Sequence, residues 1–300
     1  MKTSPQTLFL LCSLSLGCFL GCKKVDPVTP GTQKPSSSNV NPKIAATVCD
    51  YDFNDTTLTA NGWTKVFDDE FTGDLSNWYA YTGPVRNELQ YYKPDNAQIA
   101  NGVLQLSVKQ ESVTSPSAED STVQKTYNFT SGSIVSNSTF TANSATPKVR
   151  IIARVKVASG YGLVSLFESY GVDWPTNGQI NFFQVEGNDT KEYFTNYFYG
   201  QRAGENLVKN GFFSNPADED LSTCWHVFET EWTKSSLNYY LDGKLVETKT
   251  ADDLVPFLFG KAENIALSVP IGGLYYENLV PANVQTGVMY VDYVKVFTSH

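Results

Sequence analysis

Histidine is almost absent from this sequence of 300 residues, in which only His226 and His300 occur. A transition-metal centre built on imidazole and a Ser-His-Asp triad both need histidine beside several matched partners. The near-absence of histidine therefore argues strongly against both kinds of site. His226 itself is better interpreted as a hydrogen-bonded structural residue.

Basic residues are in the minority, with 22 Lys and Arg against 31 Asp and Glu and a formal net charge of -9. This balance argues against a nucleic-acid partner, which needs a basic surface. It also gives no electrostatic reason to attract anionic polymers. Aromatic residues are abundant instead, at 13%. Aromatic faces suit sugar rings, although most of these residues will lie in the core.

Long apolar runs are scarce, and the run from Leu8 to Leu20 is too short to span a membrane as a mature helix. Its length is typical of a signal-peptide core. Gly21 and Cys22 follow, so we predict a signal peptide over residues 1–21 and lipidation of Cys22. Cys18 is the second candidate, and cleavage of an ordinary signal peptide is the alternative.

The residues after Cys22 predict an anchored, exported protein. Lys23 and Lys24 resemble the start of surface or outer-membrane lipoproteins of Bacteroidetes, so the expected location is the bacterial outer membrane or cell surface. Residues 22–47 are rich in Pro, Ser, Thr and Asn and cannot bury enough surface to order themselves. They predict a disordered tether, followed by one domain over residues 48–300.

Only two cysteines, Cys49 and Cys224, lie in the predicted domain. An exported setting permits a disulfide between them. Sequence does not give their separation, so two free thiols remain the alternative.

The predicted domain has no long segment with the 3.6-residue period of a helix. From Trp63 onward it shows short alternating runs separated by Gly, Asn, Asp and Pro. This pattern predicts an all-β fold, a two-sheet β-sandwich.

One of these runs, residues 179–186, carries three amide side chains. Gln179 and Asn181 alternate and share a face, whereas Gln184 falls on the opposite face under strict period 2. One extra residue bulging near Phe182 and Phe183 would return Gln184 to their face. The three amides would then follow one line, about 6–7 Å between neighbours. That layout suits an extended polymer.

Residues 174–188 resemble the Gly-Glu-Ile-Asp-x-x-Glu motif of laminarinase-like family 16 glycoside hydrolases. Segments 66–71, 87–92, 225–233 and 288–297 also match, so the resemblance runs from Trp63 to Phe297. It implies a concanavalin-type jelly roll with a concave glycan cleft. In the family, the three acidic positions supply the nucleophile, an aspartate that helps set protonation, and the acid/base. Here they are Gln179, Asn181 and Gln184, and Glu168 stands where the family has a cleft tryptophan.

A carboxamide neither ionises near neutral pH nor delivers a proton to a leaving group. The sequence therefore predicts a catalytically inactive surface lipoprotein that binds a β-glucan-type polysaccharide, with glycan-uptake machinery as a further candidate partner. One alternative is an active endo-β-glucanase with relocated carboxylates from Glu88, Glu168 or Glu186. In a hairpin centred near Asp173, Glu168 would lie opposite Gln179 and roughly 20 Å from Glu186. A second alternative is a structural surface protein without glycan affinity.

The resemblance also predicts the individual site residues. No cofactor for chemistry is expected, but the family's structural calcium maps onto Glu70, Gly102 and Asp292. The predicted glycan-binding residues are Asn87, Glu88, Tyr92, Trp174, Gln179, Asn181, Gln184, Glu186 and Tyr197.

Overall fold

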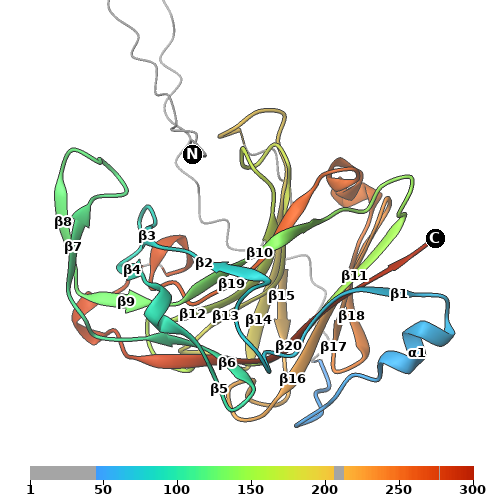
Figure 1. Cartoon of the computed structure of the whole chain (residues 1–300), viewed down its shortest axis with the longest axis horizontal. Coiled ribbons are helices and arrows are strands. Elements are labelled where there is room, and N and C mark those ends of the chain that lie inside the picture. The colour runs from blue at the N-terminus through green and yellow to red at the C-terminus, as the bar shows by residue number, and fades with distance from the viewer. Residues whose placement is uncertain (1–44, 206–212, 277) are drawn as a thin grey trace, which may run out of the picture. The chain divides into compact units, whose positions relative to one another are not determined.

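The computed structural model describes residues 45–205, 213–276 and 278–300. β-Strands are the main secondary structure of the described chain, which confirms the all-β prediction (Figure 1). The predicted signal peptide, Cys22 and the tether up to residue 44 lie outside the described residues. No helix of the described part is long and apolar enough to cross a membrane.

An eight-stranded antiparallel sheet forms one layer, in the order β18-β17-β16-β11-β20-β6-β5, with β1 also paired to β20. Its strands are β1 (Thr64–Asp69), β5 (Ala97–Ala100), β6 (Val103–Val108), β11 (Lys148–Lys156), β16 (His226–Thr233), β17 (Leu237–Leu241), β18 (Lys244–Lys249) and β20 (Gly287–Ser299).

A seven-stranded sheet forms the second layer and carries the three amides, in the order β15-β14-β13-β12-β19-β10-β2. Its strands are β2 (Trp78–Ala80), β10 (Ser133–Phe140), β12 (Val164–Tyr170), β13 (Gln179–Glu186), β14 (Glu192–Phe198), β15 (Phe213–Pro216) and β19 (Glu263–Ser268).

Smaller elements surround these layers. A three-stranded sheet and the hairpin β7–β8 lie far from α1 and β1 in Figure 1. These elements are α1 (Asp55–Ala60), β3 (Gly83–Pro84), β4 (Gln90–Tyr92), β9 (Phe129–Ser131), β7 (Val113–Pro116), β8 (Gln124–Tyr127) and the 3-10 turns η1 (Pro94–Asn96), η2 (Ala251–Asp253), η3 (Val255–Leu258), η4 (Gly273–Tyr275) and η5 (Pro281–Asn283).

The core lies between the two large sheets, where aromatic rings from both meet. Phe183 of β13 packs on Phe228 of β16 with ring centroids 4.3 Å apart, and Tyr193 of β14 contacts the same ring. All three side chains are at most 1% exposed. Burial of such rings is the main favourable term for a sandwich of this kind.

The segment before α1 is fastened to the eight-stranded sheet by a disulfide. Cys49 and Cys224 are bonded, with their Cα atoms 5.5 Å apart, which settles the alternative that the sequence left open. Ala45 also pairs with Ala217, and Thr47 donates to Asp218. Ala45 and Thr47 therefore contact the folded domain, although the sequence analysis placed both in the tether.

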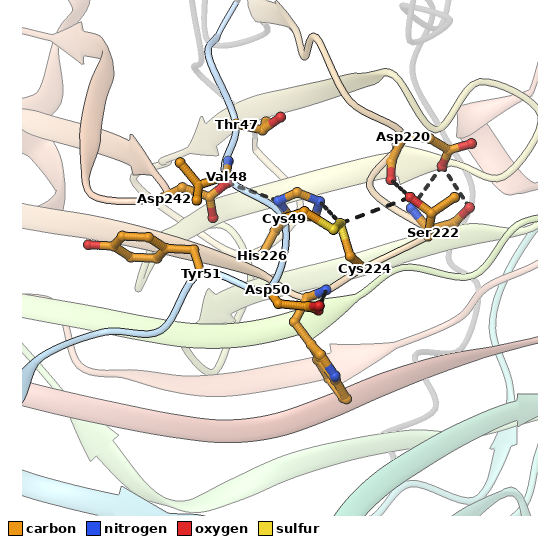
Figure 2. The surroundings of a disulfide bond; sticks show 12 residues. Thr47, Val48, Cys49, Asp50, Tyr51, Asp220, Ser222, Cys224, His226 and Asp242 are labelled. Carbon is orange, nitrogen blue, oxygen red and sulfur yellow. Dashed lines mark hydrogen bonds and ion pairs between the residues drawn. A yellow bond between two sulfur atoms is a disulfide. The ribbon is translucent and has the colours of Figure 1, made fainter.

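His226 is a structural residue beside this disulfide, as predicted. Its ring lies between the carboxylate of Asp242 and the sulfur of Cys224 (Figure 2). The same fully buried carboxylate accepts the backbone N–H groups of Val48 and Val227 at 2.8 and 2.9 Å. One carboxylate thus joins the N-terminal segment to the start of β16.

We expect replacement of both Cys49 and Cys224 by serine to lower the free energy of unfolding by about 2–4 kcal/mol, because the bond closes a loop of 175 residues in the unfolded chain. Urea unfolding of the two proteins without reductant measures the difference. In excess reductant the difference will vanish, and equal stabilities without reductant would contradict the prediction.

Candidate functional site

A β-bulge places the three amides on one face of the seven-stranded sheet. Gln184 lies opposite Leu166 of β12, and Asn181 lies opposite Glu168, with Phe182 as the extra residue between the two pairs. Leu166 and Glu168 are two positions apart and share a face, so Gln184 and Asn181 share it too. This confirms the predicted bulge. We call this face, which carries Gln179, Asn181 and Gln184, the site face.

The sheet register shows which other side chains belong to the site face, because directly opposed residues share a face. Three rows cross the sheet. They are Tyr79, Val135, Ala266, Glu168, Asn181 and Asn196; Ser133, Ser268, Leu166, Gln184 and Phe194; and Asn264, Tyr170, Gln179 and Phe198. The middle of the face is built from small or uncharged side chains, apart from Glu168.

Gln179 joins three neighbours through its amide group. Its Oε1 accepts the indole N–H of Trp174 at 2.5 Å. Its Nε2 donates to Glu168 Oε2 and to Asn181 Oδ1, each at 2.8 Å. The structure therefore brings together Trp174, Gln179 and Asn181, three of the predicted binding residues.

The residue opposite Glu168 lies two positions further along β13 than predicted. Glu168 lies opposite Asn181 rather than Gln179, because the turn between β12 and β13 centres one residue later than expected. Glu186, at the other end of β13, is then five residues from the position opposite Glu168. That is roughly 16 Å at about 3.3 Å per residue, still beyond the separation of any paired glycosidase carboxylates.

Gln184 and Glu186 continue along the same strand. Gln184 is 4% exposed, and its amide makes no hydrogen bond within the described part of the chain. Glu186 lies opposite Val164 on the same face, as predicted, and is half-buried. Burial, with smaller contributions from Glu192 and Asp189, raises its pKa to about 7. Both residues stay candidates for ligand contact.

Glu88 is the second carboxyl close to the centre of the site face. It is 8% exposed and accepts hydrogen bonds from the Gln90 amide and, at 3.3 Å, from the Tyr92 hydroxyl. Burial raises its pKa to about 7. Burial likewise raises the pKa of Glu168 to about 7, opposed by the bond from Gln179 and reinforced by the charge of Glu88. Both carboxyls therefore titrate near neutral pH.

Two predicted binding residues offer no aromatic face on which a sugar ring could stack. Tyr197 is fully buried on the core side of β14, opposite Ile180, so its prediction as a sugar contact is wrong. Tyr92 is 4% exposed, which leaves its ring no face for stacking, although its hydroxyl holds Glu88. Asn87 is exposed and stays a candidate for ligand contact. Its backbone N–H donates to Glu119, which lies between β7 and β8.

Several tyrosines near the site face were missed by the sequence analysis. Tyr170 follows Glu168 on the same face, and burial, with smaller contributions from Glu168 and Tyr79, raises its pKa. Burial raises the pKa of Tyr275 of η4, and the nearby charges of Glu168 and Glu88 add to the rise. Tyr170 could have been predicted on the site face from the sequence, because it lies two residues after Glu168 in the same strand.

A buried carboxyl supports the site face from behind. Glu263 is fully buried, and its Oε2 accepts the Ser169 hydroxyl at 2.5 Å, while its Oε1 has no hydrogen-bond partner among the described residues. Gly178, directly before Gln179, must be glycine, because its φ is +78° and a Cβ would collide with Glu263 Oε1. Glu263 therefore bonds β12 and lies against the end of the turn that carries Trp174.

Glu263 makes the stability of the domain pH-dependent. Burial raises its pKa from 4.5 to about 8, so the folded protein keeps this proton while the unfolded chain loses it. Stability contributed by this group therefore falls as pH rises from about 4.5 to 8. The Glu263→Gln variant cannot ionise at this position. We therefore expect the melting temperature of the variant minus that of wild type to be roughly 5 °C larger at pH 8 than at pH 5. Calorimetry at both pH values tests this, and an equal difference at both would contradict it.

The predicted calcium ligands are already paired with cations. Glu70 and Asp292 line one surface hollow of about 430 Å³, but Glu70 contacts Lys295 at 2.9 Å and Asp292 contacts Arg154 at 2.7 Å. Gly102 is not among its lining residues. The described residues contain no group of three or more His, Cys, Asp or Glu arranged to hold a metal ion. This donor set does not fit calcium as it stands, and calcium binding stays a prediction. A melting temperature unchanged by calcium or by EGTA would count against it.

Comparison with known proteins identifies the domain. Residues 87–295 match the profile of the glycosyl hydrolases family 16. The laminarinase catalytic domain from Thermotoga maritima superposes with a TM-score of 0.66 and 22% identity, covering 80% of this chain and 99% of that one. An endo-beta-1,3-glucanase from Pyrococcus furiosus gives a TM-score of 0.65 and 24% identity over 79% and 94% of the two chains. At these identities the likeness shows the fold.

Curated relatives match over shorter stretches. The Clotting factor G alpha subunit of Tachypleus tridentatus is 24% identical over 78% of this chain and 34% of its own length. A Beta-glucanase of Bacillus subtilis is 31% identical over 32% of this chain and 38% of its own length. The chain thus spans about a third of the length of these relatives.

Proposed function

This chain belongs to the glycosyl hydrolases of family 16, and within that family we propose that it binds a β-glucan-type polysaccharide without cleaving it. The observation that carries the proposal is the chemistry of the aligned side chains on β13. Gln179, Asn181 and Gln184 occupy one face, in the line that the bulge at Phe182 creates.

The absence of catalysis follows from these amides. Retaining hydrolysis needs a nucleophilic carboxylate and an acid/base about 5–5.5 Å apart. Neither Gln179 nor Gln184 ionises or transfers a proton. Because such residues act as a unit, losing both removes many orders of magnitude in rate.

Binding is supported by what the same face offers. Amides donate and accept hydrogen bonds, as sugar hydroxyls do. Gln184 has its amide uncommitted among the described contacts, and Trp174 presents an indole ring that is 41% exposed. A glycan lying along β13 would meet both, since Gln179 ties Trp174 to the strand.

We expect the soluble chain from residue 23 to release or absorb heat when titrated with laminarin or lichenan, and to generate no reducing ends. Agarose, whose backbone differs, serves as a control for glycan specificity. The Trp174→Ala variant should weaken binding at least tenfold, because a stacking ring is lost. New reducing ends with purified protein would disprove the inactive assignment. No heat with any of the three glycans would favour the structural surface protein.

A second candidate, hydrolysis by relocated carboxyls, is favoured by one observation. Burial raises the pKa of both Glu88 and Glu168 to about 7, and the charge of Glu88 adds to the rise at Glu168, as expected for two carboxyls that lie close together. Glu168 alone contacts an aligned amide, at 2.8 Å from Gln179. Reducing ends that disappear in both Glu88→Gln and Glu168→Gln would establish this alternative.

We also propose that the chain is exported and lipid-anchored through Cys22, placing the domain at the outer membrane or cell surface, where glycan-uptake machinery could receive its ligand. The support is the sequence pattern before and after Cys22. In cells fed a labelled fatty acid, Cys22→Ser should abolish labelling, whereas the matched control Cys18→Ser should keep it. The reverse result would move the anchor to Cys18.

A further inference from the structure

We propose that Trp174 and Glu168, held in place by Gln179, form one sugar subsite that accepts a neutral pyranose and rejects anionic glycans. This inference rests on the proposed function and deepens it, because it names the residues that contact the ligand and the charge class of the ligand.

Gln179 is a positioning residue, because its hydrogen bonds are already used within the protein. Its amide has two N–H groups, and both are committed, one to Glu168 and one to Asn181. Its oxygen accepts the indole N–H of Trp174. A ligand would therefore meet the two groups that Gln179 orients rather than the amide itself.

Trp174 and Glu168 offer the two features that a pyranose recognises. The Trp174 ring is 41% exposed and is backed by Phe198 of β14, with ring centroids 5.6 Å apart. An indole face suits the apolar C–H face of a sugar. Above about pH 7, where Glu168 is mainly ionised, its half-buried carboxylate accepts hydrogen bonds from hydroxyl groups, and such charge-assisted bonds are among the strong ones.

The surroundings of Glu168 carry no compensating positive charge. None of the ion pairs between described residues includes Glu168 or Glu88. The groups that face Glu168 are Gln179 and Asn181 of β13, Ala266 of β19, Tyr170 of its own strand, Tyr275 of η4 and the carboxyl of Glu88. A sulfate or carboxylate on the sugar would add a like charge to this setting, which is unfavourable.

The amide at position 179 and the carboxylate at position 168 depend on each other. A carboxyl at 179 would lie about where the amide lies, 2.8 Å from Glu168 Oε2, and two such groups cannot both ionise. Gln179→Glu would therefore force a shared proton and remove the donor that orients Glu168. Restoring this one family carboxyl should weaken glycan binding rather than restore hydrolysis.

The test is calorimetric titration at pH 8, where Glu168 is mainly ionised, of the soluble chain from residue 23 with laminarin and with carboxymethylated laminarin, which has the same backbone and added carboxylates. Wild type should bind laminarin at least tenfold more tightly than the anionic form. Glu168→Gln should weaken laminarin binding about tenfold and reduce that preference, because a charged acceptor is lost. Gln179→Glu should also weaken laminarin binding. The exposed Glu219→Gln is the matched control and should change neither quantity.

The outcomes separate the two proposals. If wild type binds laminarin but Glu168→Gln binds it equally and keeps the same preference, the subsite is wrong and the proposed function stands. If wild type binds neither polymer, both proposals fail. Melting temperatures verify folding of each variant. Should Glu168→Gln not fold, Trp174→Phe keeps a stacking ring but removes the indole donor, and unchanged laminarin binding by it would overturn the role of Gln179.

Discussion

The single extra residue at Phe182 is the constraint on which the candidate site depends. Without it, strict alternation along β13 would turn Gln184 toward the core, where Phe183 packs on Phe228 of the opposite sheet. With the extra residue, β13 can place aromatic side chains in the core and amide side chains on the outer face, although strict alternation would not allow both. Aromatic rings fill the interior, and three amides follow one line on the outer face.

Around that line, hydrogen-bonded amides and buried carboxyls stand where the resemblance places ionisable catalytic carboxyls. The hydrogen bonds of Gln179 connect an exposed indole to a half-buried carboxyl, so a polar network stands where the resemblance places a nucleophile. The pKa values of the nearby Glu88 and Glu168 carboxyls are raised to about 7, because burial disfavours their charged forms. Burial likewise raises the pKa of Glu263 behind the sheet, and this rise outweighs the opposing effects of the Ser169 hydrogen bond and of the charge of Lys261.

Much of the fold could be predicted from the sequence, because alternation and turn residues are local signals. The two-sheet architecture, the bulge and the structural role of His226 are confirmed. Tyr197 could not be placed correctly, because both faces of β14 carry aromatic rings and the pattern does not tell which face is inside. The register of Glu168 depends on the conformation of the turn after β12. The approach of Tyr275 to Glu168 depends on contacts between distant segments, which local patterns do not contain.

The most direct measurement of the central claim is a crystal structure of the protein grown with laminarihexaose. The account predicts an intact oligosaccharide along β13, with one ring stacked on Trp174 and hydroxyl groups within hydrogen-bond distance of Glu168 and Gln184. A cleaved oligosaccharide in the crystal would contradict the loss of catalysis. An intact one bound away from the site face would contradict the proposed binding surface.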